Sequence, residues 1–123
     1  MTNPLYEEFF EKHRFSEKNF LFLKNKETIL YKEYITSIER ISFFFKELGL
    51  FPGDRVALKL KKSPIFLSIY GACVHRGLIF LPLNDGYTND EILYYLRDSE
   101  SKLLITDKET SSELKSKKLD QGF

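Results

Sequence analysis

Residues 76–91, RGLIFLPLNDGYTNDE, decide the fold because they hold a helix end, a strand, a turn and a helix start in one short stretch. Gly77 can adopt the positive φ that ends a helix, and the four apolar residues after it are enough for a buried strand. Pro82 lacks the amide donor that a strand needs to continue. Thr88 and Glu91 have the spacing of a capping box, which begins a helix. The stretch therefore predicts the joint of an α/β layer.

The chain upstream of this stretch predicts a hairpin and a long helix. Residues 20–23 and 28–31 are apolar and flank a polar loop, as the two strands of an antiparallel hairpin do. From 31 to 48 the apolar residues alternate between spacings of four and three, which indicates an amphipathic helix. Its stripe comprises Tyr34, Ile38, Ile41, Phe45 and Leu48. Residues 3–14 predict a further short helix, with Leu5, Phe9 and Phe10 on one side.

Between the long helix and residue 77 the sequence predicts a strand followed by a crossover helix. Pro52 and Gly53 suit a type II turn, residues 55–60 form a mostly apolar strand, and Ser63-Pro64 supplies an N-cap and a first-turn proline. The apolar face expected on this helix comprises Phe66, Ile69, Tyr70 and Cys73. A connection of this length joins parallel strands by a right-handed crossover.

A third strand is predicted at residues 103–106, after a helix that contains Ile92, Leu93 and Leu96. The fold class is therefore α/β: a partial N-terminal subdomain with a mostly parallel three-stranded βαβαβ core, preceded by a β-hairpin and a long amphipathic helix. Residues 108–123 are polar, and we expect a weak helix there that frays into disorder, because Leu114 and Leu119 are too sparse for a stable apolar stripe. A three-stranded parallel sheet followed by such a tail is expected to be incomplete.

Composition excludes several classes of partner. The 123 residues are 42% hydrophobic and carry a formal net charge of +1, so no global field attracts nucleic acid or an anionic membrane. The lone Cys73 cannot form an intrachain disulfide and fits a reducing compartment. No apolar run approaches the roughly 18 residues of a membrane span, and the N-terminus is acidic. We therefore expect a cytoplasmic protein.

No residue of the sequence predicts a catalytic, cofactor-binding or metal-binding role. His13 and His75 have no Cys or carboxylate cluster at ligand spacing, which argues against a metal site. Neither glycine-rich pattern of a phosphate-binding loop occurs. A buried, inert Cys73 is favoured over a nucleophile because it lies on the apolar stripe. His75 is favoured as a partner of the helix dipole over a general base.

Three further groups admit a functional and a structural interpretation, and the structural one is favoured for each. Asp90 and Glu91 fall in the first turn of a helix, where carboxylates complement the dipole. The basic run at residues 59–62 could bind phosphate or nucleic acid, but a solvated strand end explains it as well. The aromatic triplet at residues 43–45 is expected to be buried between layers, with an exposed docking patch as the alternative.

In order along residues 19–107, these signals resemble the start of the adenylate-forming enzymes, the superfamily of acyl-CoA synthetases and AMP-dependent ligases. The segments that carry the resemblance are TILYKEY at 28–34, PGDRVA at 52–57, Ser63-Pro64 and FLPLNDGYTNDE at 80–91. The last segment is most similar to malonyl-CoA and methylmalonyl-CoA synthetases. The resemblance implies that residues 1–107 are the N-terminal portion of an AMP-binding domain, with a polar tail at 108–123.

The resemblance also implies a ligase that uses ATP and Mg²⁺ to form an acyl-adenylate from a carboxylate and then transfers the acyl group to coenzyme A. The phosphate loop, the adenine and ribose contacts and the catalytic lysine of that family have no counterpart here. We therefore expect an N-terminal fragment that binds none of these cofactors alone and is inactive alone. The alternatives are a non-catalytic subunit that docks onto a separately encoded remainder and an independent α/β binding module.

Overall fold

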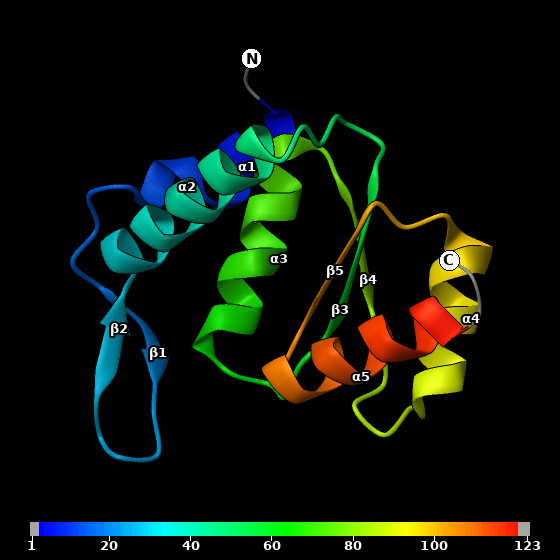
Figure 1. The fold of residues 1–123 in the computed structure, drawn as a ribbon. Coiled ribbons are helices and arrows are strands. Elements are labelled where there is room, and N and C mark those ends of the chain that lie inside the picture. Colours follow the sequence, from blue (N-terminus) through cyan, green and yellow to red (C-terminus); the bar gives the residue numbers. More distant parts are fainter. Residues whose placement is uncertain (1–2, 121–123) are drawn as a thin grey trace. The chain divides into compact units, whose positions relative to one another are not determined.

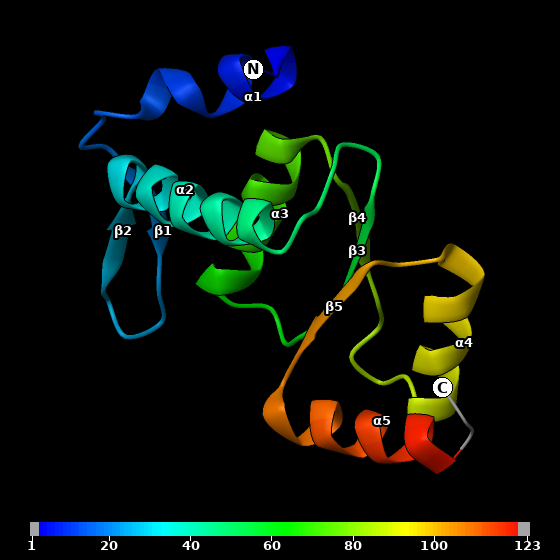
Figure 2. The same cartoon turned by 45° about the horizontal axis from the view of Figure 1, so that its top comes forward.

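The computed structural model describes residues 3–120, and the side chains of residues 3–117. Two compact units are present: the first comprises residues 3–53 and Lys62–Ile79, and the second comprises Asp54–Lys61 and residues 80–120. Figures 1 and 2 show the chain from two directions. The elements confirm the predicted α/β class, with a hairpin, a long helix and a three-stranded parallel sheet.

The first unit contains the hairpin and three helices. Its elements are α1 (Pro4–Phe9), the 3-10 turn η1 (Glu11–His13), β1 (Asn19–Phe22), β2 (Thr28–Leu30), α2 (Tyr31–Glu47) and α3 (Pro64–Arg76). The hairpin is antiparallel, as predicted, with Leu21 opposite Ile29 and Phe22 opposite Thr28. Its strands end at Phe22 and begin at Thr28, so the loop also includes Leu23, which was expected in the first strand. In both views α2 crosses α3 (Figures 1 and 2).

The contact between α2 and α3 depends on a glycine. A Cβ atom at Gly71 would lie 2.7 Å from Cγ1 of Ile38 and 3.0 Å from the hydroxyl oxygen of Tyr34. That hydroxyl donates a hydrogen bond of 2.9 Å to the carbonyl oxygen of Leu67, so the two helices are joined by polar as well as apolar contact. Ile38 is fully buried at this point. The absence of a side chain on Gly71 therefore sets how closely the helices approach.

The buried face of α3 differs in part from the predicted one. Ile69 and Cys73 are buried as expected, but Tyr70 is 42% exposed and Phe66 is half-buried. Their places are taken by small residues: Ser68, Gly71 and Ala72. A stripe based on large apolar residues misses this face because close helix packing selects small side chains.

The short N-terminal helix also buries a different face from the expected one. Leu5 and Phe9 are 52% and 62% exposed, whereas Tyr6 is 3% exposed. The Tyr6 ring stacks on Phe10 and contacts His75, with ring centroids 5.1 Å and 4.5 Å apart. The aromatic partners of Tyr6 therefore decide the orientation of α1, and apolar spacing alone does not.

The second unit contains the parallel sheet. Its elements are β3 (Arg55–Lys59), β4 (Ile79–Pro82), α4 (Asn89–Ser99), β5 (Leu103–Thr106) and α5 (Lys108–Asp120), and β4 begins at the last residue of the first unit. The strand order is β4-β3-β5. Val56, Ala57 and Leu58 of the central strand are buried, as a strand with neighbours on both sides requires. Val56 pairs with Leu103 in the parallel ladder.

Residues 108–120 form a helix, α5, where a weak and fraying one was expected. Leu114 packs with Ile92 and Leu93 of α4 and is 4% exposed. A single leucine is enough because Leu83, Leu96 and Leu104 complete the same cluster. The expected disorder at residues 121–123 and the side chain of Leu119 lie outside the described residues, and the domain boundary at 107 stays a prediction.

Substituting Gly71 with Ala should destabilise the protein by about 1–3 kcal/mol, although alanine favours helix more than glycine does. The added methyl group would overlap Ile38. Chemical denaturation of G71A, I38V and the double variant measures the coupling between the two sites. In the double variant part of the loss should be recovered, and strictly additive losses would contradict the proposed contact.

Candidate functional site

The carboxyl ends of the parallel strands form the edge of the sheet at which a ligand site is expected, because open α/β sheets bind ligands there. In the second unit β3 ends at Lys59, β4 at Pro82 and β5 at Thr106. The Thr106 hydroxyl donates a hydrogen bond of 2.8 Å to the Lys59 carbonyl oxygen, which joins two of the strand ends. The Leu83 amide donates to the Leu58 carbonyl oxygen at 2.8 Å and joins the third.

The loop after β4 is organised by its own side chains. The Asn84 side-chain oxygen accepts a hydrogen bond of 2.8 Å from the Gly86 amide, and the Tyr87 amide donates to the Asn84 carbonyl oxygen. The predicted capping box at α4 is confirmed: the Glu91 amide donates to the Thr88 hydroxyl and the Glu91 carboxylate accepts from the Thr88 amide, at 3.2 and 3.1 Å. The loop therefore positions the helix, and the amides of Thr88 and Glu91 are already bonded.

The N-terminus of α5 is closed in the same way. Asp107 accepts hydrogen bonds from the amide and the hydroxyl of Thr110, at 2.8 and 2.9 Å. These two bonds, with the nearby Lys59 charge, lower the pKa of the Asp107 carboxyl. The two helices of this unit, α4 and α5, thus each carry a carboxylate of their own where an anionic ligand would bind. The edge supplies a framework and offers no free phosphate site at these two helix ends.

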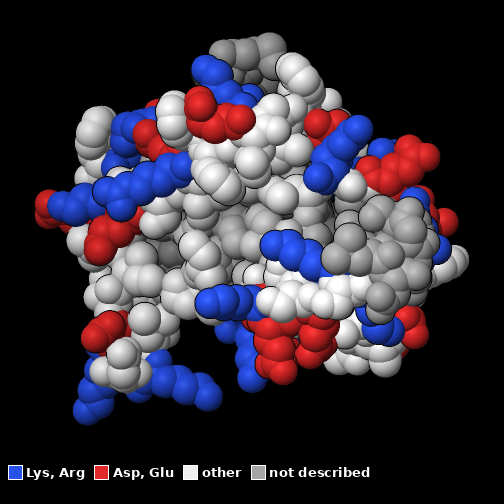
Figure 3. Space-filling model, viewed as in Figure 1, with Lys and Arg blue, Asp and Glu red and all other residues white. Residues whose placement is uncertain are grey.

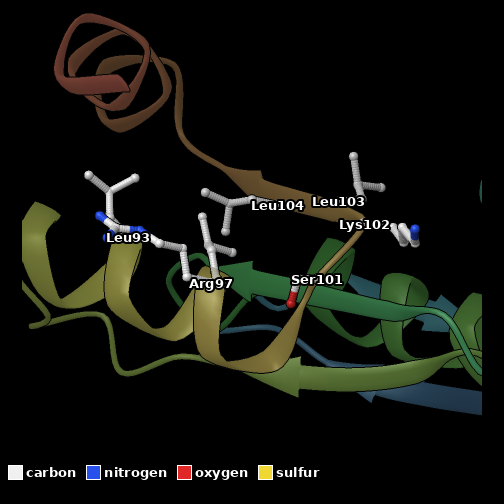
Figure 4. A pocket seen from close by; sticks show the side chains of 7 residues that line it. Leu93, Arg97, Ser101, Lys102, Leu103 and Leu104 are labelled. Atoms are coloured by element: carbon white, nitrogen blue, oxygen red, sulfur yellow. The ribbon is translucent and has the colours of Figure 1, made fainter. Parts of the chain in front are cut away.

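A small hollow lies between α4 and the start of β5 (Figure 4). Its volume is about 210 Å³, below the roughly 300 Å³ of typical small-molecule pockets. Leu93, Leu96, Leu103 and Leu104 make most of its wall. The Ser101 hydroxyl at its rim is 2.6 Å from the Ser99 hydroxyl. Its volume is too small for a nucleotide, and its wall is mostly apolar.

A larger hollow of about 410 Å³ lies in the first unit among aromatic side chains of α1, β1, α2 and α3. The ring of Phe20 stacks on Tyr34 with centroids 4.0 Å apart, and His13 stacks on Tyr31 at 4.6 Å. These rings pack against one another, and the Tyr34 hydroxyl is already bonded to Leu67. The wall of the hollow is mostly aromatic and apolar, and it holds no carboxylate, lysine or arginine side chain to pair with a charged substrate.

A serine–histidine pair is the polar contact that sequence reasoning missed. Ser42 Oγ lies 2.5 Å from Nδ1 of His75, although the residues are 33 positions apart and no motif joins them. Such a pair resembles a nucleophile and its base, but Ser42 is 2% exposed and a substrate has no access to it. The pair is structural: it connects α2 to α3.

His75 therefore has a different role from the expected one of dipole partner. Burial, with the neighbouring Arg76 charge, lowers the pKa of His75, while Glu39 and Glu11 act in the opposite direction. A lowered pKa disfavours the imidazolium form that would complement the helix C-terminus. The neutral ring instead bonds Ser42 and packs on Tyr6.

The remaining chemically active side chains have structural environments. Cys73 is fully buried, as its place on the apolar stripe predicts, and burial raises the pKa of its thiol to about 12. Asp90 pairs with Lys117 at 2.7 Å on the surface. Lys61 and Lys62 are exposed, and on the face shown in Figure 3 acidic and basic side chains alternate without a large area of one sign. Within residues 3–120 no three His, Cys, Asp or Glu side chains could hold a metal ion together.

The expected burial of the aromatic triplet at residues 43–45 is correct only for Phe45. Phe45 is 1% exposed, whereas Phe43 and Phe44 are 64% and 57% exposed. Three consecutive residues of a helix point in three directions, and α2 is covered on one side only in this unit. Among the described helices none has the length and apolar content needed to cross a membrane.

The pKa of His75 predicts how stability depends on pH. Because folding lowers this pKa, the unfolded chain binds the proton more readily, so the free energy of unfolding is largest above the ordinary histidine pKa of about 6.5 and falls as pH drops through the folded value. Substituting His75 with Asn should make the decline between about pH 7 and pH 5 shallower, measured by urea denaturation at each pH. His13→Asn is the control, and an unchanged slope in H75N would refute the assignment.

Two buried tyrosines offer a matched comparison of satisfied and unsatisfied hydroxyls. The Tyr6 hydroxyl is buried without a hydrogen-bond partner in the described part of the chain, whereas that of Tyr34 donates to Leu67. Tyr6→Phe should therefore keep or raise the free energy of unfolding, and Tyr34→Phe should lower it by about 1 kcal/mol. Thermal denaturation of both variants measures their Tm values, and the Tm of Y6F must be higher than that of Y34F.

Comparison with known proteins gives a consistent result. Residues 9–122 match the family described as AMP-binding enzyme. The chain is 34% identical over 97 residues to the oxalate–CoA ligase of Arabidopsis thaliana, covering 78% of this chain and 19% of the relative. It is 31% identical over 105 residues to the nonribosomal peptide synthetase sidE of Aspergillus fumigatus, covering 80% of this chain and 5% of the relative.

Among solved structures, apo MatB from Rhodopseudomonas palustris superposes with a TM-score of 0.86 at 30% identity, over 94% of this chain and 23% of that one. The ATP-bound form of MatB superposes with a TM-score of 0.83. The chain thus spans less than a quarter of the length of each of these relatives.

Proposed function

Since this chain belongs to the AMP-binding enzyme family, we propose that it is the N-terminal part of an AMP-forming acid–CoA ligase. Such an enzyme joins a carboxylate to AMP with release of pyrophosphate and then transfers the acyl group to the thiol of coenzyme A. The observation that carries the proposal is the family match over residues 9–122 together with the superposition on MatB over 94% of the chain.

Within that enzyme the chain has the role of a scaffold. The helix N-termini at the carboxyl edge are capped by Glu91 and Asp107, and the Ser42–His75 pair is buried, so the described side chains offer neither a phosphate site nor an accessible nucleophile there. ATP, Mg²⁺ and coenzyme A are then bound by other parts of a complete ligase. The 123 residues alone are inactive under this proposal.

The substrate class that we propose is a small dicarboxylate, with malonate as the first candidate. Two features support it. The first is the similarity to an oxalate–CoA ligase and to MatB, and the second is the sequence FLPLNDGYTNDE at residues 80–91. We further propose a cytoplasmic location. The carboxylate would be bound only by the complete enzyme. The hollow of about 550 Å³ that contains Arg14 and Lys32 also contains Glu39, and both cations are already paired with carboxylates.

Two proteins test the proposed function: the isolated chain and a chimera with MatB. The isolated chain should catalyse no malonate-dependent ATP–pyrophosphate exchange above background. A chimera in which residues 9–122 replace the corresponding segment of MatB should fold and regain exchange activity. The matched control carries Gly77→Val, which a φ of 70° at this position does not tolerate, and should lose activity with folding. A folded but inactive chimera, or exchange by the isolated chain, would refute the proposal.

A non-catalytic subunit is the second candidate, and one observation favours it. The sheet has only three strands, and β4 and β5 are its two outer strands, so the edge of either could accept a further strand from another chain. Co-expression of this chain with MatB that lacks its matching first segment should then give a complex with exchange activity. Failure of the two proteins to co-purify would count against this candidate.

A further inference from the structure

The outer face of α2 carries an apolar surface that the proposed function does not use. Phe43 and Phe44 are 64% and 57% exposed, and Leu48 and Phe51, which follow the end of α2 in the chain, are 48% and 71% exposed. Together these side chains present roughly 450 Å² of apolar surface, within the range of the largest patches on monomeric proteins. A patch of that size is typical of an interaction surface.

Two opposite charges bracket the exposed phenylalanines. Arg40 and Glu47 are exposed, and with Phe43 and Phe44 they occupy positions i, i+3, i+4 and i+7 of one helix face. None of the ion pairs found among the described residues includes Arg40 or Glu47. The two lie about 10 Å apart along the helix axis, too far to pair with each other. Each is therefore available to a charge on another molecule.

The order of these four residues is self-complementary. Read in the opposite direction, the sequence Arg-x-x-Phe-Phe-x-x-Glu has the same apolar centre and exchanged charges at its ends. A two-fold axis between residues 43 and 44 would place Arg40 of one helix opposite Glu47 of an antiparallel second helix, and Phe43 opposite Phe44. The interface would be isologous, which is the arrangement of most homodimers.

We propose that the face formed by Arg40, Phe43, Phe44 and Glu47 binds a second copy of this chain, with the two α2 helices antiparallel. Two Arg40–Glu47 ion pairs then flank a central cluster of four phenylalanines. A standard interface buries about 800 Å² on each partner, and the exposed apolar patch supplies about half of this. The aliphatic stem of Arg40 adds to it. The self-complementary order of the charges selects a second copy over an unrelated partner.

Sedimentation equilibrium of the full 123-residue chain tests the dimer. We expect a concentration-dependent monomer–dimer equilibrium, and the double variant Phe43→Ser/Phe44→Ser should raise the dissociation constant by at least about tenfold. The matched control is Phe22→Ser, since Phe22 is 76% exposed on the hairpin and lies outside the proposed face. A monomer at all concentrations, or a dimer that survives the double substitution, overturns the proposal.

Charge reversal tests the antiparallel arrangement and the identity of the partner. Arg40→Glu alone places Glu opposite Glu, and Glu47→Arg alone places Arg opposite Arg, so each variant should dimerise about tenfold more weakly. A mixture of the two variants restores both ion pairs and should form a heterodimer, measured with distinguishable tags. The double variant R40E/E47R should dimerise with itself again.

These outcomes separate the possible occupants of the face. A different partner, or another segment of a longer protein, would give no preference for the mixed pair, and that result overturns the proposal. The substituted residues are exposed, so circular dichroism should show unchanged helix content in every variant. The result does not depend on the ligase function, because it is read from mass and not from activity.

Discussion

A single left-handed residue, Gly77, connects the last helix of the first unit to the parallel sheet of the second. Its φ is 70°, and the amides of Gly77 and Leu78 bond back to the carbonyl oxygens of Val74 and Cys73, which closes α3. Its own carbonyl oxygen accepts a hydrogen bond of 2.9 Å from Gly53, itself at a positive φ of 92°. Two reversals of the chain that are far apart in sequence are thus bonded to each other. A side chain at either position would strain the backbone, so both turns depend on glycine.

What the sequence could predict was local. The capping box at Thr88 and Glu91, the proline at the end of β4 and the existence of the hairpin each follow from residues close together in the chain. The stability of these features depends on residues that are close together in the sequence. Residue type and spacing are therefore sufficient to predict them. The family resemblance rests on the same segments, because these turns fix the chain path that the relatives share.

What the sequence could not predict depends on contacts between distant segments. The burial of Tyr6 is set by His75, and the small face of α3 is set by Ile38 of α2, neither of which a helical periodicity contains. Leu114 looked isolated because its partners Ile92 and Leu93 lie on another helix. The Ser42–His75 bond is of the same kind. Amphipathic patterns show that a face exists, but the shape of its partner decides which residues fill it.

The two faces of α2 differ in packing: the inner face packs closely against α3, whereas the outer face is exposed. The inner face is held by Gly71, whose missing side chain leaves room for Ile38 and for the Tyr34 hydroxyl. The outer face has no such constraint within its unit, so selection for solubility would be expected to leave polar residues there. Phe43 and Phe44 depart from that expectation, while Arg40 and Glu47 on the same face keep it. An apolar centre with a charge at each end is how specific helix pairs combine affinity with a fixed orientation, because the charges disfavour the parallel arrangement that the phenylalanines alone would allow.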